Sequence, residues 1–150
     1  MQNTNESREI IVNFIKEHED AQQPLVTKDG SACFDFYSIE DVTIKPGKSA
    51  KIENGIRVLV PEGYFLTFST RSSMGFMKDA FVYPGILDSN WKSNLAIKVY
   101  NLGDEDIIIK KGDRYAQGRF EKTLQVQFIQ QSTEEFDSRI CRGGWGSSGK

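Results

Sequence analysis

The sequence predicts a single all-β domain, and three observations support this fold class. Short apolar runs recur along the chain, most of them only a few residues long. Turn pairs such as Pro46-Gly47 and Asn54-Gly55 separate these runs. Only residues 71–77 have the pattern of a short helix inside the domain. Many short strands with turns at this spacing are typical of a β-sandwich, a jelly roll or a barrel.

The expected elements follow one another closely. The first strand is expected at residues 9–15, which are rich in Ile, Val and Phe. Residues 17–30 are polar and contain Pro24, so we interpret them as a surface connection. Residues 56–60 alternate in the manner of a half-buried strand. The remaining strands are expected at residues 33–37, 42–44, 50–52, 64–69, 95–101, 107–109 and 124–128.

Length and charge limit the classes of function. A chain of 150 residues is long enough for one core, so residues 1–150 are expected to form one domain, with residues 1–8 as a disordered start. The formal net charge of −2 argues against a general nucleic-acid or membrane-surface binder, since both need excess basic charge. The polar start and the lack of a long apolar run predict a cytoplasmic protein.

The rarity of histidine and cysteine narrows the chemistry further. His18 is the single histidine, which excludes a multi-histidine metal site and argues against a Ser-His-Asp triad. Cys33 and Cys141 lie far apart and match no metal-binding spacing. Any reaction must therefore rest on carboxylates, cations, hydroxyls and backbone amides.

Two stretches in the first half of the chain carry groups that would suit a triphosphate. Residues 32–38, A-C-F-D-F-Y-S, place the carboxylate of Asp35 among aromatics, although an Asp that caps a neighbouring turn would have the same pattern. In T-R-S-S-M-G, residues 70–75, an arginine precedes two hydroxyls at an expected strand-to-helix junction. Such a junction offers a planar guanidinium, hydroxyl donors and free N–H groups to phosphate oxygens. A helix N-cap with a solvated Arg71 is the alternative interpretation.

Two further stretches contain carboxylates at expected turns. In G-I-L-D-S-N-W, residues 85–91, Asp88 follows an apolar triplet, and a carboxylate beside apolar walls can act as a base toward water. A turn in which Asp and Asn make local hydrogen bonds would explain the same letters. Residues 111–117, K-G-D-R-Y-A-Q, are in themselves a charged hairpin turn that leads into a strand.

The fifth stretch is the glycine-rich end of the chain, R-G-G-W-G-S-S-G-K at residues 142–150. Its glycines are incompatible with a regular element, because ordering them costs too much entropy. The tail could close over a nucleotide, with its amides facing the phosphates and the Trp145 ring stacked on a base. A disordered tail is the alternative explanation of this composition.

Taken together and in this order, the five stretches resemble the five motifs of the trimeric dUTPase family. Residues 32–38 resemble A-G-Y-D-L-x-S, and R-S-S at residues 71–73 is similar to R-S-[SG]. Residues 85–91 resemble G-[VIL]-[IL]-D-x-[DN]-Y, and residues 111–117 match K-G-[DE]-R-x-A-Q. The tail resembles R-G-G-F-G-S-[ST]-G, and the likeness covers residues 29–150.

This resemblance implies a distorted jelly-roll β-barrel or sandwich with one short helix and a flexible closing tail at residues 142–150. It implies a homotrimer in which each active site takes motifs from all three chains. The implied reaction is the hydrolysis of dUTP to dUMP and pyrophosphate, with Asp88 as the base that aligns a water for attack on the α-phosphorus. Mg²⁺ would be held by the substrate phosphates, without a direct protein ligand.

The resemblance also assigns roles to individual residues. The supporting residues are expected to be Asp35, Asp113 and Arg114. Phosphate contacts are expected from Arg71, Ser72, Ser73, Gln117, Arg142, Ser147 and Ser148. Base and sugar contacts are expected from Val82, Ile86, Leu87, Trp91, Ala96, Trp145 and Gly146. The hairpin backbone at Ala96 would read the uracil edge, and Trp91 would lie against the deoxyribose.

Four residues depart from the family pattern. Trp91 replaces the usual tyrosine, Trp145 replaces the stacking phenylalanine, Cys33 stands where glycine is common, and Ser93 replaces the hairpin glycine. Ser93 puts the base-reading turn in doubt.

Three other interpretations stay open from the sequence alone. A dCTP deaminase has a related fold and can carry a tryptophan like Trp91, but its proton-moving glutamate lies seven residues further on, where this chain has Lys98. A non-catalytic trimeric nucleotide-binding regulator would keep the fold, although Asp88, Arg71 and Arg142 are all present. A purely structural jelly roll would leave the order of the five motifs unexplained.

Overall fold

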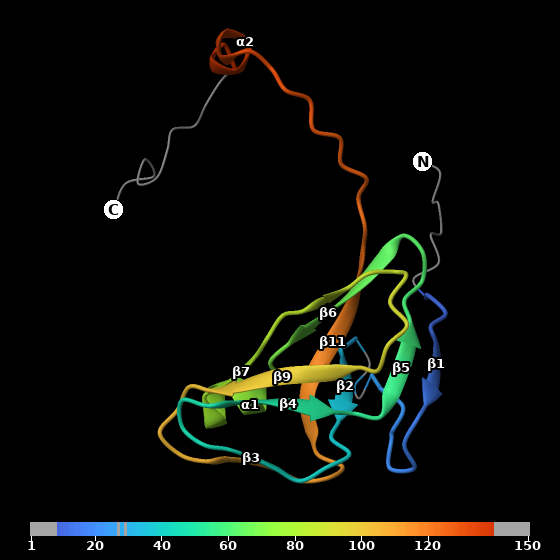
Figure 1. The fold of residues 1–150 in the computed structure, drawn as a ribbon, viewed down its shortest axis with the longest axis vertical. Helices are drawn as coiled ribbons and strands as arrows, with labels where there is room; N and C mark the ends of the chain where they lie inside the picture. The colour runs from blue at the N-terminus through green and yellow to red at the C-terminus, as the bar shows by residue number, and fades with distance from the viewer. Residues whose placement is uncertain (1–8, 27, 29, 140–150) are drawn as a thin grey trace.

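The computed structural model describes residues 9–26, 28 and 30–139, and in them it contains eleven short strands and two short helices (Figure 1). The strands are β1 (Asn13–Lys16), β2 (Phe34–Tyr37), β3 (Val42–Ile44), β4 (Ser49–Glu53), β5 (Ile56–Leu59), β6 (Tyr64–Ser69), β7 (Ala80–Val82), β8 (Ile86–Leu87), β9 (Ala96–Asn101), β10 (Ile107–Ile109) and β11 (Arg114–Lys122). The helices are α1 (Ser72–Lys78) and α2 (Thr133–Asp137).

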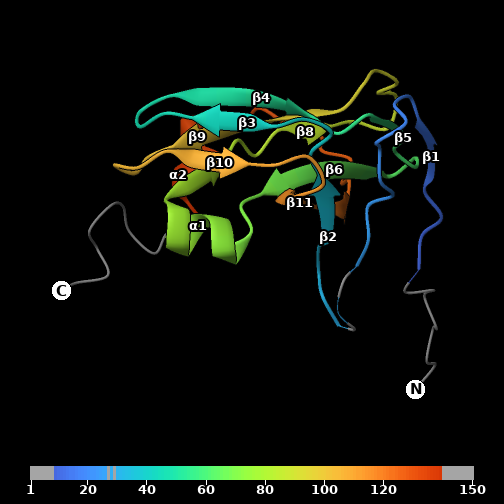
Figure 2. The same cartoon turned by 90° about the horizontal axis from the view of Figure 1, so that it is seen from below.

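The strands form small antiparallel sheets around one core. The largest has the order β2-β11-β6-β8, a second has the order β4-β9-β7, and β1-β5 and β3-β10 form two separate pairs. Strands β3, β4, β9 and β10 lie above β2, β6 and β11 in Figure 2. Since β11 pairs with both β2 and β6, residues from three distant parts of the chain meet at its two edges.

The core forms because apolar residues alternate along the strands. In β9, Ile97 and Val99 are buried while Lys98 between them is exposed. Tyr115 is fully buried in β11, and its hydroxyl donates to the Ile52 carbonyl at 2.9 Å. Burial raises the pKa of this phenol well above its usual value, so Tyr115 stays a neutral hydrogen-bonding group in the core.

The structure corrects several expectations about individual elements. The first strand begins at Asn13, because the strand is defined by pairing with β5 and that pairing covers only four residues. Residues 124–128 form no strand, so that prediction is wrong. Their alternating apolar side chains lie in solvent, with Phe128 94% exposed, and the segment runs away from the body of the subunit (Figure 1).

The prediction of one short helix is also wrong, because α2 forms a second. Ser132 starts α2 with a capping box: its side chain accepts from the Glu135 N–H, and the Glu135 carboxylate accepts from the Ser132 N–H. The letters S-T-E-E at residues 132–135 are the local signal of this capping box. The strands β7 and β8 were not anticipated either, since both are too short to show a periodic pattern.

No helix in the described ranges is long and apolar enough to cross a membrane. Residues 1–8 and 142–150, for which the sequence predicts a disordered start and a closing tail, lie outside the described residues.

Candidate active site

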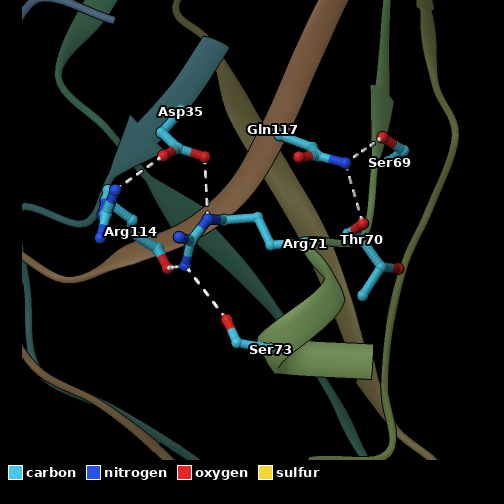
Figure 3. A network of polar contacts seen from close by, with 7 residues as sticks. All are labelled: Asp35, Ser69, Thr70, Arg71, Ser73, Arg114 and Gln117. Carbon is cyan, nitrogen blue, oxygen red and sulfur yellow. Dashed lines mark hydrogen bonds and ion pairs between the residues drawn. The ribbon is translucent and has the colours of Figure 1, made fainter. Parts of the chain in front are cut away.

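A buried carboxylate orients two of the predicted site residues. Asp35 lies in β2, opposite Gln117 of β11, and its side chain is only 10% exposed. One carboxylate oxygen accepts from Arg71 Nε at 2.8 Å, and the other accepts from Arg114 Nη1 at 3.2 Å (Figure 3). Asp35 therefore orients two arginines rather than capping a turn, which was the alternative interpretation of this residue.

Arg71 is held in place from several sides. It stands between β6 and α1, and its side chain is 19% exposed. Besides the bond to Asp35, its Nη1 donates to the Arg114 carbonyl at 2.8 Å and lies 3.5 Å from Ser73 Oγ (Figure 3). Arg71 is the N-cap residue of α1, as the alternative interpretation has it, but its guanidinium is held by protein groups rather than solvated. One carboxylate and two guanidinium groups leave this cluster with a surplus positive charge, which favours an anionic ligand.

Gln117 fixes the junction that leads into Arg71. Its Nε2 donates to Ser69 Oγ at 3.2 Å and to the Thr70 carbonyl at 3.1 Å. On the other side of the junction, Thr70 Oγ1 accepts from the Val82 N–H at 2.8 Å. The two side-chain contacts of Gln117 thus go to the end of β6, and a direct contact to phosphate stays a prediction. Sequence reasoning missed Ser69 and Thr70, although both hydroxyls directly precede Arg71.

The turn before Arg114 is shaped by Asp113. The Asp113 carboxylate accepts from the Lys110 N–H at 2.9 Å, and its backbone carbonyl accepts from the Ser38 N–H at 2.9 Å. The Gly112 N–H donates to the Ser38 carbonyl at 2.7 Å, and Gly112 has φ +87°, which glycine adopts without strain. Asp113 therefore helps to set where β11 begins.

The first turn of α1 exposes the two serines of the second motif. Ser72 and Ser73 are both exposed, and Ser73 Oγ lies 3.5 Å from Arg71 Nη1. Their hydroxyls can donate to an anion that approaches the arginine pair.

Asp88, which is predicted to act as the base toward water, lies in another part of the fold, as do the residues predicted to contact the uracil and the sugar. Asp88 follows β8, is exposed, and its backbone carbonyl accepts from the Trp91 N–H at 3.0 Å. Trp91 is 43% exposed, and its Nε1 donates to the Ser93 carbonyl at 3.2 Å. Ile86 is exposed, Ala96 begins β9, and the side chains of Val82 and Leu87 are buried in the core.

The two groups are not joined within the subunit. In residues 9–26, 28 and 30–139, no hydrogen bond or ion pair connects Asp88 to the cluster of Asp35, Arg71 and Arg114. The predicted residues Arg142, Trp145, Gly146, Ser147 and Ser148 lie outside the described residues. A cavity of about 750 Å³ between β1, β2 and β11 is lined by none of the predicted site residues.

Comparisons with known proteins identify the family. The dUTPase family model matches residues 19–149, which is most of the chain. The chain belongs to the dUTPase family. It is 35% identical over 140 residues to the deoxyuridine 5'-triphosphate nucleotidohydrolase of Helicobacter pylori strain P12, covering 92% of this chain and 96% of that protein. The enzyme of the same name from Hydrogenobaculum is 31% identical over 137 residues, covering 89% and 94%.

A solved structure supports the fold. The chain superimposes with a TM-score of 0.83 on a variant of the Staphylococcus bacteriophage 80alpha dUTPase with dUpNHpp, covering 93% of this chain and 99% of that one at 24% identity. A dUTPase from phage phi11 of S. aureus, described with a structural Mg(II) ion, gives a TM-score of 0.75 at 20% identity and covers 81% and 96%. The predicted jelly roll of the dUTPase type is confirmed by these likenesses.

Proposed function

We propose that this protein hydrolyses dUTP to dUMP and pyrophosphate. The observation that carries the proposal is the buried Asp35 carboxylate, which orients Arg71 and Arg114 beside the first turn of α1. An arginine pair with surplus positive charge suits a polyphosphate, and the relatives named above act on deoxyuridine triphosphate.

The phosphate chain would be held by groups whose positions are already set. Arg71 and Arg114 neutralise negative charge, while Ser72 and Ser73 donate hydroxyl hydrogen bonds at the same edge. Because these groups are fixed before the ligand arrives, little ordering is needed during the reaction. Arg142, Ser147 and Ser148 would add donors from the tail. Holding the phosphates in line accounts for most of the catalysis of phosphoryl transfer.

Asp88 is the group proposed to act on water. Its carboxylate is exposed and makes no hydrogen bond to any residue that the structure describes. It is therefore accessible to a water molecule. The water oxygen bonds to the α-phosphorus while the bond from that phosphorus to the bridging oxygen breaks. Pyrophosphate leaves with the bridging oxygen, and the water proton passes to Asp88.

Mg²⁺ is proposed to be held by the substrate phosphates. The donors around Arg71 are guanidinium groups and hydroxyls, which bind phosphate oxygens, and no group of three or more metal-binding side chains occurs in the described residues. When bound, the ion would supply positive charge that neutralises the triphosphate.

The active site is proposed to form between the subunits of a homotrimer. This would bring the Asp88 loop of one chain to the arginine cluster of another, with Trp145 and Gly146 of a tail covering the base. The exposed apolar alternation of Leu124, Val126 and Phe128 supports the proposal, because such a stripe needs a partner surface. Light scattering is expected to give a trimer. V126D with F128D is expected to weaken the trimer, whereas F76D, which changes an equally exposed phenylalanine on α1, should not.

Nucleotide selectivity is the direct test of the proposed function. Uracil offers an N3–H donor and an O4 acceptor, and the backbone at Ala96 is proposed to read them, so a wrong base would leave polar groups unpaired at about 1–3 kcal/mol each. With Mg²⁺, pyrophosphate release from dUTP should far exceed release from dTTP, dCTP or UTP. Equal turnover of all four would contradict the proposal. Ammonia release from dCTP would instead indicate a deaminase. Lys98 already argues against that activity, because it stands where a deaminase has its proton-moving glutamate.

A further inference from the structure

The loop of residues 88–95 is attached to β5 by two neighbouring residues. The Leu95 N–H donates to the Ile56 carbonyl at 3.1 Å, and Arg57 Nη1 donates to the Lys92 carbonyl at 3.3 Å. In the described ranges these are the only hydrogen bonds from the loop, up to the start of β9, to another element. The Leu95 contact is between backbones, so Arg57 is the side chain that determines how the middle of the loop sits.

Arg57 is itself held by an acidic partner. Its Nε lies 2.9 Å from Glu17 Oε1, and the side chains of Arg57 and Glu17 are 40% and 33% exposed. The Nε atom is buried but makes no well-directed hydrogen bond, so its contact with Glu17 is an ion pair. The guanidinium thus links the carboxylate of Glu17, which directly follows β1, to the Lys92 carbonyl of the loop.

Glu17 is fixed by its own backbone. The Glu17 N–H donates to the Gly55 carbonyl at 2.8 Å, directly before β5. Gly55 has φ +69°, and a Cβ there would come within 2.8 Å of the His18 Cβ. Only glycine at this position therefore lets residues 18–21 pack this closely. Ala21 is buried, and Asp20 forms an ion pair with Lys111 at 3.0 Å. Residues 17–21 are therefore a docked segment rather than a free connection.

Arg57 also lies beside the predicted sugar-contacting residue. A groove of about 290 Å³ is lined by Phe14, Arg57, Leu59, Trp91 and Lys92, among others. The Trp91 ring is tied to its own loop through the Ser93 carbonyl. A shift of the loop would consequently carry the Trp91 ring and Asp88 with it.

We propose that Arg57, oriented by Glu17, is a positioning residue that sets the loop of residues 88–95 and thereby the selection of nucleoside. This inference rests on the proposed function. Arg57 acts through the Lys92 carbonyl and touches no reacting atom. It stabilises the loop that carries Ser93, the departure that puts the base-reading turn in doubt. The contact of Trp91 with the sugar needs this support, because discrimination against a 2′-hydroxyl depends on a fixed wall.

The first test follows loop order in the free protein and does not depend on activity. R57M keeps most of the apolar stem but removes the guanidinium, and R57K keeps the charge without the planar fork. Amide hydrogen exchange in residues 89–95 should accelerate about three- to tenfold in both variants, as expected when a charge-assisted hydrogen bond at a half-exposed site is lost. R119M, which breaks the similarly exposed Arg119–Glu121 pair on β11, is the matched control and should leave these amides unchanged.

The second test measures selectivity in the same variants and in E17Q. The KM for dUTP should rise about three- to tenfold, and the preference for dUTP over UTP should fall in parallel. E17Q should show a smaller effect of the same kind, because it disturbs Arg57 without removing it. If R57M does not fold, R57K and E17Q carry the test.

The outcomes separate the inference from the function on which it rests. Unchanged exchange and unchanged dUTP/UTP selectivity in R57K and E17Q, with an active wild type, would overturn the inference alone. A wild type that releases no pyrophosphate from dUTP would overturn the proposed function and the selectivity role of Arg57 together. A uniform fall in kcat with unchanged selectivity would make Arg57 merely structural and would also overturn it.

Discussion

The cluster around Asp35 and the loop of residues 88–95 are both parts of the proposed active site, yet they are built differently. In the cluster, side chains from β2, α1's entry and β11 hold one another through a nearly buried carboxylate. In the loop, Asp88 and Trp91 are exposed, and among the residues that the structure describes only two hydrogen bonds tie the loop to another element. The comparison indicates that the groups proposed to bind phosphate are fixed in advance, while Asp88, the group proposed to act on water, is left exposed.

The largest expected effect concerns Asp88, in the exposed loop. D88N removes the negative charge that is proposed to accept the water proton but keeps the shape of the side chain. We expect kcat to fall by about 10²–10⁴-fold, the usual contribution of a general base, while the free energy of unfolding hardly changes because the side chain is exposed. Steady-state kinetics and calorimetric titration with dUTP check this.

D106N provides a control, since it neutralises an aspartate outside the loop of residues 88–95, one that pairs with Lys45. A D88N protein with nearly normal kcat would mean that another group activates the water. Loss of dUTP binding in the same variant would mean that Asp88 holds substrate instead.

The next effect lies on the fixed side and should appear in stability as well as activity. D35N leaves Arg71 and Arg114 facing each other without their shared carboxylate. Removing one partner of a buried ion pair costs about 3–5 kcal/mol, and the lower end applies because Arg114 is 43% exposed. Denaturant unfolding should therefore show a loss of about 3 kcal/mol, and the KM for dUTP should rise.

D41N is the comparison for D35N. Hydrogen bonds from the Lys111 backbone and the Lys110 side chain lower the pKa of Asp41, but this carboxyl is exposed, so its removal should change unfolding little. If D35N and D41N proved equally stable, the Asp35 cluster would not be the fixed half of the site.

Site residues could be predicted best where several of them are neighbours in the sequence. The letters of R-S-S at residues 71–73 suit a phosphate site or a helix N-cap, and K-G-D-R at 111–114 is in itself a charged turn, so the family resemblance was needed to assign both. Arg71, Ser73 and Arg114 of these stretches lie in the cluster. That Asp35 binds Arg71 and Arg114 could not be predicted without the family, because these residues are 36 and 79 positions away. Their meeting depends on β11 lying between β2 and β6, and sheet order leaves no local signal.

The segment of residues 124–128 illustrates the opposite limit. Its alternation is typical of a strand, but a strand also needs a partner edge. In the described part of the subunit these residues lie in solvent, so a local pattern alone gave the wrong structure. If the apolar side chains of this segment pack against another subunit, as the proposed trimer would require, their environment cannot be predicted from strand pairing within one chain.

The smallest expected effect tests how far the fixed half extends beyond its charged members. Q117M keeps the length of the side chain but removes the donors to Ser69 Oγ and the Thr70 carbonyl. Since these groups are only partly buried, the loss should be about 1 kcal/mol in unfolding, and the KM for dUTP should rise only a few-fold. Q22M, which changes an exposed glutamine, is the control and should have neither effect.

Q117E then distinguishes an anchoring role from a phosphate-contacting one. Its carboxylate oxygen would face the Thr70 carbonyl, and two acceptors repel, so Q117E should unfold more easily than Q117M even without nucleotide. If Gln117 instead serves only as a direct phosphate donor, both variants would keep wild-type stability and differ only in KM. Unfolding measured in the absence of dUTP therefore decides whether the end of β6 belongs with the fixed half of the site.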